Sequence, residues 1–113
     1  MPDLRVYGVN TGQSSTFYFP FLDPLSSTGS YRTTTPTLDV ANDLTLYVDG
    51  SGVANTGAAL TWLGSGYGKL VLTAAQMEGS IIVAIISDAS GSQWVDTSII
   101  VHTGGRGNYA NAL

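Results

Sequence analysis

The chain has no cysteine, only four basic residues and a single histidine among its 113 residues. Without cysteine it can form neither a disulfide nor a thiolate metal site, so the sequence leaves the redox compartment open. Four basic residues against eight acidic ones give a net charge of −4, which argues against a nucleic-acid surface. The longest apolar run has six residues, far fewer than the roughly 20 that span a bilayer. We therefore expect neither nucleic acid nor membrane as a partner.

The N-terminal residues lack the basic start and apolar core of a signal peptide, so we expect synthesis and assembly in a cytoplasm. An apolar fraction of 43% with only 11% charged residues excludes global disorder. A chain of this length is predicted to fold as one domain with its own hydrophobic core.

Three short apolar runs, each bounded by polar turn residues, lie in the second half of the chain. They are Leu70–Leu72, Ile81–Ile86 and Ile99–Val101, and their β-branched residues predict strands rather than a helix. The middle run is apolar at every position, although neighbouring side chains of a strand point to opposite faces. It is therefore predicted to be the central strand, covered on both sides. On this interpretation Ile85→Ala would cost roughly 2–5 kcal/mol.

The remaining predicted strands alternate in hydrophobicity or are rich in β-branched and aromatic residues. They are Thr16–Leu22, Thr37–Asp49 and Ala58–Leu63, the second with a turn at Asn42–Asp43 before its alternating part. The runs Leu70–Leu72 and Ile99–Val101 belong to longer predicted strands over Lys69–Thr73 and Trp94–His102. Pro20 places Thr16–Leu22 at a sheet edge, because proline donates no ladder hydrogen bond. Thr73 and Gln76 have capping-box spacing and Gly79 can end a helix, so a single helical turn is expected to cross between sheets.

About seven short strands punctuated by Gly, Asp and Ser predict an all-β, antiparallel β-sandwich with one short helical turn. A small Greek-key barrel is the alternative architecture. The predicted organisation is a flexible N-terminal arm over 1–15, the sandwich over 16–103 and a flexible C-terminal tail over 104–113. Within the N-terminal arm, Leu4–Tyr7 is a candidate for a short edge strand.

The candidate contact residues lie outside the predicted sandwich core. Tyr31 and Arg32 are the large polar side chains of a long Pro/Ser/Thr/Gly-rich loop over 23–36, where they are either solvated or touch a partner. The tail is either disordered or orders against a neighbouring subunit. The two predicted arms supply the other candidates: Leu4, Val6, Tyr7, Arg106, Tyr109 and Leu113.

No residue pattern predicts catalysis or a bound metal. His102 shares its strand with Asp96 and Ser98 at spacings of six and four, too extended for a local triad. Residues 49–52 and 88–91 lack the alternating acids and terminal glutamate of a calcium loop. The glycine-rich residues 64–68 are not followed by a helix with a phosphate-binding lysine. The chain is therefore predicted to be non-enzymatic, without cofactor or metal.

Four segments within residues 38–103 follow one another in a distinctive order: Leu44–Gly50, Gly66–Met77, Ser80–Asp88 and Trp94–Val101. This order resembles a module of tailed-bacteriophage structural proteins. In that module a strand ending in Asp-Gly is followed by a Gly-x-Tyr/Phe-x-Leu-x-Leu-Thr-Ala-Ala-Glu-Met segment. An Ile/Val-rich strand and a final strand with Asp-Thr come after it. Gln76 replaces the more usual acid, and Tyr67 lies one residue early. The resemblance implies an Ig-like β-sandwich in a virion, with no enzymatic residues.

Three functions are therefore considered. The leading expectation is a capsid decoration or cement protein on the outer surface of a phage head. It would bind the major capsid protein or another virion protein, as a homo-oligomer or high-copy assembly located in the virion. The second is a tail, neck or baseplate module of the same virion. The third is a carbohydrate-binding sandwich that uses Trp62, Trp94 or Tyr47 as an exposed stacking platform, whereas the alternative role for both tryptophans is core packing.

Overall fold

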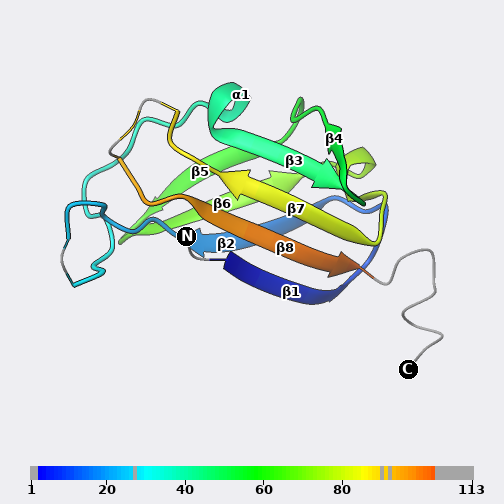
Figure 1. Cartoon of the computed structure of the whole chain (residues 1–113), viewed down its shortest axis with the longest axis horizontal. Coiled ribbons are helices and arrows are strands. Elements are labelled where there is room, and N and C mark those ends of the chain that lie inside the picture. The colour runs from blue at the N-terminus through cyan, green and yellow to red at the C-terminus, as the bar shows by residue number, and fades with distance from the viewer. Residues whose placement is uncertain (1–2, 27, 90, 92, 104–113) are drawn as a thin grey trace.

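Two β-sheets pack face to face in the computed structural model, which describes residues 3–26, 28–89, 91 and 93–103 (Figure 1). Sheet A has the strand order β1 (Asp3–Val9), β8 (Thr97–Thr103), β7 (Ile81–Ile86), β3 (Leu44–Val48) and β4 (Ser51–Val53). Sheet B has the order β2 (Ser15–Pro20), β6 (Tyr67–Leu72) and β5 (Ala59–Gly64). The predicted β-sandwich is confirmed, with eight strands in the described residues rather than about seven.

The strand order is that of an Ig-like sandwich. In such a fold a B-E-D sheet packs on a G-F-C sheet, and variable-type domains add a C′ strand. Here β2, β6 and β5 occupy the places of B, E and D, while β8, β7, β3 and β4 occupy those of G, F, C and C′. The sheets are not wholly antiparallel, because β1 pairs parallel with β8 from Asp3↔Ser98 to Tyr7↔His102. Residues 3–9 of the predicted flexible arm are thus an edge strand of sheet A, and this strand contains the candidate edge strand Leu4–Tyr7.

Burial alternates along the strands because sheet B covers only one face of sheet A. On β7, Ile82, Ala84 and Ile86 are 0% exposed. Their neighbours point the other way: Ile81 is 43% exposed, and Val83 and Ile85 are half-buried. The prediction that β7 lies centrally is confirmed, since it sits between β8 and β3. The prediction that it is covered on both sides is wrong.

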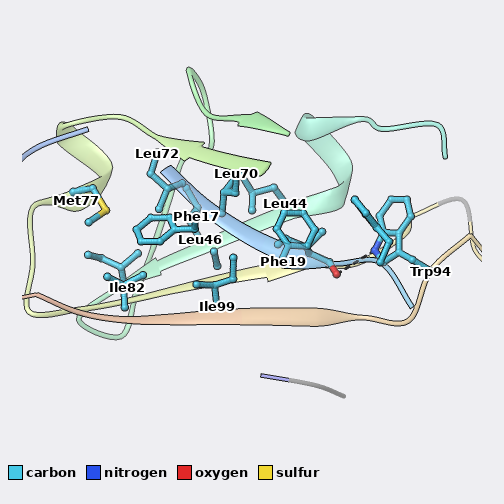
Figure 2. Close-up of a cluster of buried hydrophobic side chains, with 14 residues drawn as sticks. Phe17, Phe19, Leu44, Leu46, Leu70, Leu72, Met77, Ile82, Trp94 and Ile99 are labelled. Carbon is cyan, nitrogen blue, oxygen red and sulfur yellow. Dashed lines mark hydrogen bonds between the residues drawn. The ribbon is translucent and has the colours of Figure 1, made fainter. Parts of the chain in front are cut away.

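The core lies between the sheets and is lined by alternate residues of their strands (Figure 2). Phe17, Phe19 and Phe21 are buried as expected from their spacing, and β2 is an edge strand as its proline predicted. The rings of Phe19 and Phe21 lie over Gly68 on the neighbouring β6, where a Cβ atom would collide with both. Gly68 therefore allows the aromatic layer to approach the backbone of sheet B.

A single 3₁₀ turn, η1 (Ala75–Met77), carries the chain from sheet B to sheet A, as predicted. The expected capping box is present: the backbone N–H of Gln76 donates to Thr73 Oγ1 (3.2 Å), and that of Thr73 donates to Gln76 Oε1 (2.9 Å). The Gln76 amide also donates to the carbonyls of Ala54 (3.0 Å) and Thr56 (3.1 Å). This buried side chain thus joins the turn to the β4–β5 connection, which a carboxylate could not do.

Within Thr37–Asp49, β3 begins at Leu44, directly after the turn predicted at Asn42–Asp43; this turn is the end of a one-turn helix, α1 (Val40–Asp43), so residues 37–43 are not part of the strand. The carboxylate of Asp43 is buried and accepts the backbone N–H groups of Asp39 (2.8 Å) and Ala89 (2.9 Å), which fixes this turn. Side-chain bonding of this local kind competes with strand pairing.

Two further boundaries differ from the sequence interpretation. Residues 51–53 form β4 rather than remaining in the turn, because Asp49 and Gly50 alone make the reversal with φ values of 50° and 87°. The last strand starts at Thr97 instead of Trp94.

Candidate interaction surfaces

The outer face of sheet A is the side turned away from sheet B, and it faces the viewer in Figure 1. Three cross-strand rows form it, as the pairing register shows. The first row is Asp3–Ser98–Ile85–Thr45, the second is Arg5–Ile100–Val83–Tyr47, and the third is Tyr7–His102–Ile81. At its centre Val83, Ile85 and Ile100 are half-buried and Ser98 is buried (4% exposed), while Tyr7 (59%) and Tyr47 (40%) lie at its two sides.

Tyr7 does not stand alone on this face. Its ring stacks on the imidazole of His102 with a centroid distance of 4.6 Å and an interplanar angle of 9°. The Arg5 guanidinium donates to His102 Nε2 at 3.3 Å, and its other terminal nitrogen lies 3.9 Å from the Asp3 carboxylate. His102 is therefore a cross-strand packing residue between β1 and β8, with no nucleophile in this arrangement.

A second candidate surface is the loop that follows β2 and projects at one end of the long axis (Figure 1). Its base is closed by the bridge Leu22↔Tyr31 and by the backbone N–H of Asp23 donating to Ser30 O (2.9 Å). Inside it, Ser26 Oγ accepts the backbone N–H groups of Thr28 (3.2 Å) and Ser30 (3.0 Å). The described part of this loop is therefore held by its own hydrogen bonds.

Leu25 projects from this braced loop with 87% of its surface exposed, the largest value among the exposed large hydrophobic residues of the described chain. Its backbone N–H donates to Asp23 Oδ1 (2.9 Å), so the backbone that carries the side chain is fixed. An isolated exposed leucine is common on protein surfaces. Here the backbone on either side of the leucine is held by hydrogen bonds within the described part of the loop.

Tyr31 and Arg32, predicted as contacts, are engaged within the molecule. Tyr31 (44% exposed) packs edge-on against Tyr67, with hydroxyl oxygens 3.3 Å apart, and it covers Gly66. The hydrogen bond with Tyr31, in which the Tyr67 hydroxyl donates, is the main cause that raises the pKa of Tyr67 above the ordinary tyrosine value, and the charge of an ionised Tyr31 adds to it. Arg32 donates from Nε to Thr34 O (2.6 Å) and from Nη1 to Gln93 O (2.8 Å). Its guanidinium therefore braces the loop, while the Tyr31 ring keeps an accessible edge.

The other predicted contact residues fall into two groups. Leu4 and Val6 point inward and pack against the core, so they stabilise the edge of the sandwich. Arg106, Tyr109 and Leu113 lie outside the described residues. The exposed Ile81 and Leu25 were not predicted from the sequence, although the apolar run on both parities of β7 already indicated a second apolar face. Tyr47 was predicted only as a stacking residue for a carbohydrate.

Neither tryptophan presents a fully exposed indole face on which a sugar ring could stack. Trp94 is only 3% exposed and its indole Nε1 donates to Ile86 O at 3.3 Å (Figure 2), so it cannot be a stacking platform. Trp62 packs against the core with its ring 5.6 Å from that of Phe21. Core packing is therefore the role of Trp94 and the main role of Trp62, and Tyr47 alone of the three candidates is freely accessible.

No cluster of three or more potential metal ligands occurs within the described ranges. The depression beside α1 contains Asp39 and Asp43, but their carboxylates accept hydrogen bonds from Asn42 and from backbone N–H groups. Nor does the described part of the chain contain a helix long and apolar enough to cross a membrane.

No protein-family model and no curated protein sequence matches the chain. Among solved structures, it is similar to the M1 domain from titin, with a TM-score of 0.42 and 11% identity over 94% of this chain and 92% of that one. It is also similar to the titin M3 domain, with a TM-score of 0.39 and 16% identity over 89% and 92%. For titin kinase with its flanking domains the TM-score is 0.42 and the identity 10%, and the matched region spans 93% of this chain but 16% of that one. The strand order above, rather than these distant likenesses, defines the fold.

Proposed function

We propose that this chain is a non-enzymatic structural protein of a bacteriophage virion, a decoration or cement protein that binds the outer surface of the head. The sequence resemblance over residues 38–103 suggests the virion. The observation that supports docking is Leu25, 87% exposed on a loop braced by its own hydrogen bonds. Binding through such a loop loses little further conformational entropy, which favours affinity from a small contact.

The chemistry of this surface fits adhesion rather than turnover. The loop presents an apolar side chain, hydroxyl groups and the exposed edge of Tyr31. Aromatic side chains of this kind are frequent at the centres of protein–protein interfaces. The only histidine of the chain is stacked on Tyr7 and bonded to Arg5, far along the sequence from this loop.

The test measures how much of the protein stays on purified phage particles. Particles are assembled with wild-type protein or with Leu25→Ser, washed at increasing dilution, and the ratio to major capsid protein is read from gels. Full burial of a leucine side chain contributes about 2 kcal/mol, so retention of the variant should weaken roughly 30-fold. Immunogold electron microscopy of the same particles distinguishes the head from the tail, neck or baseplate.

Leu63→Ser is the matched control, because Leu63 is also exposed (49%) but lies on β5. It should be retained like the wild type. Absence of the wild-type protein from washed particles would refute a virion role altogether. Label confined to the tail would favour the alternative location. Specific binding on a glycan array, lost in Tyr47→Ala, would instead favour the carbohydrate-binding alternative.

A further inference from the structure

We propose that the outer face of sheet A is a self-association surface that binds the same face of a second copy of this chain. The inference depends on the geometry of β1, β8, β7 and β3 and does not require the chain to be a virion protein. It also uses a different surface from the loop that carries Leu25.

The composition of the face is that of an interface core rather than of an ordinary solvated sheet surface. Val83, Ile85 and Ile100 form a half-buried aliphatic centre on adjacent strands. Tyr47 (40% exposed) and Ile81 (43%) extend this apolar surface at its margins. Interfaces concentrate aromatic and aliphatic side chains at their centre and place charges at the rim. The solvent-exposed face of an antiparallel sheet normally carries polar side chains.

The charges on this face favour a second copy as the occupant. The three rows contain one acidic side chain, Asp3, and one basic side chain, Arg5, so the face is neutral although the chain carries −4. Two copies can therefore meet here without bringing their excess negative charges together. The existing contact between Asp3 and Arg5 is long, at 3.9 Å, and both side chains are half exposed. Such a surface ion pair is easily exchanged for an intermolecular one.

The positions of these charges are self-complementary. A face-to-face dimer of identical chains has its two-fold axis in the plane of the interface, and each contact occurs twice. If the axis crosses the strands between the Asp3 and Arg5 rows, each Asp3 lies opposite the Arg5 of the second copy. The same operation places Ile85 opposite Val83 of the second copy, because both pairs belong to the same two rows. One axis thus satisfies the charged edge and the aliphatic centre together.

The area suits a weak but specific dimer. The four strands of the three rows, about 4.8 Å apart and about six residues long at about 3.3 Å per residue, cover roughly 380 Å² in projection. Two such faces present roughly 760 Å² before the relief of the side chains is added. This value lies below the range of stable interfaces, about 1,200–2,000 Å² in total, and suits a weak contact. We therefore expect association in the micromolar range or weaker.

The first experiment is sedimentation equilibrium of the full chain from about 5 µM to about 1 mM, a range that covers a small interface. The wild type should shift from monomer to dimer. Tyr47→Lys should raise the dimer dissociation constant at least tenfold, because it places a charge in the second row. Tyr18→Lys is the matched control, since Tyr18 is 62% exposed on β2 of sheet B, and it should change the constant less than twofold.

The second experiment tests the symmetry with charge reversal. Asp3→Arg and Arg5→Asp should each weaken self-association at least tenfold, because every facing pair then carries like charges. An equimolar mixture of the two variants should form a heterodimer close to wild-type strength. Circular dichroism of each variant verifies folding. Both positions are exposed, so we expect both variants to fold.

Three results would overturn the inference. One is a wild type that stays monomeric at about 1 mM. Another is a dimer that survives Tyr47→Lys but is lost in Tyr18→Lys. The third is a monomeric wild type whose Tyr47→Lys variant falls off phage particles, which would assign this face to another virion protein. Failure of the mixed charge variants to pair would refute the proposed axis.

Discussion

Truncation of one isoleucine on each face of β7 measures how unequally the two faces are buried. Ile82 is 0% exposed between the sheets, whereas Ile85 lies on the outer face and is half-buried. Both substitutions, Ile82→Ala and Ile85→Ala, remove the same three carbon atoms from the same strand. Backbone propensity and unfolded-state effects are therefore closely matched, and the difference between them reports burial.

The magnitudes follow from the structure. Removing three buried carbons at about 0.8 kcal/mol each gives about 2.4 kcal/mol for Ile82→Ala. The cavity left beneath sheet B raises the loss toward about 3–4 kcal/mol, within the range for buried Ile→Ala changes. Ile85→Ala leaves no enclosed cavity and removes side-chain area that is already partly in water. Its loss should be about 1 kcal/mol.

Urea unfolding followed by tryptophan fluorescence is a suitable assay, because Trp94 is buried in the same core. Samples must be dilute, at a few micromolar or below, where a weak dimer of the expected size is dissociated. If Ile85→Ala loses as much free energy of unfolding as Ile82→Ala under these conditions, the one-sided burial described here is incorrect. Excess loss for Ile85→Ala only at high concentration would instead reflect the proposed dimer.

Three further predictions concern single contacts. Gln76→Glu should lower the free energy of unfolding by about 1–3 kcal/mol in urea melts, because a carboxylate cannot donate to the two carbonyls of the β4–β5 connection. Tyr67 should ionise above the ordinary tyrosine pKa in an ultraviolet titration of wild type against Tyr67→Phe, and Tyr31→Phe should bring it down. Since the raised pKa favours the protonated phenol in the folded state, this stabilisation is present below the unfolded pKa, near 10, and is lost as pH rises through the folded value. Gly68→Ala should destabilise the fold by about 1–3 kcal/mol in thermal melts, because the new Cβ would lie about 2.8 Å from the nearest Phe19 atom and closer still to Phe21.

The elements that depend on local pattern were predictable from the sequence. The alternation of Phe17 and Phe19 predicted the buried face of β2, and Pro20 predicted its edge position. The spacing of Thr73 and Gln76 predicted the capping box at η1. In each case the residues that form the structure lie within a few positions of one another, so their spacing in the sequence is enough to predict it.

The features that depend on distant pairing were not predictable in the same way. Nothing near Leu4 indicates that residues 3–9 would pair parallel with β8, almost the whole length of the chain away. The run of Ile81–Ile86 is apolar on both parities whether its outer face meets a second sheet or a second molecule. The exposure of Leu25 could not be predicted from the sequence, because it depends on the conformation that hydrogen bonds within the loop give to its backbone.

The parallel pairing of β1 with β8 has a mechanical consequence. Because these adjacent strands run in the same direction, the start of β1 at Asp3 and the end of β8 at Thr103 lie at opposite ends of one ladder. A pulling force applied between these two points loads that ladder in shear, so that its hydrogen bonds resist together instead of opening one after another. A force applied between Ser80 and Thr103, at the same end of the antiparallel β7–β8 pair, would peel the strands apart sequentially. Single-molecule extension should therefore show a higher rupture force for the first geometry. Equal forces would mean that the edge strand carries no load.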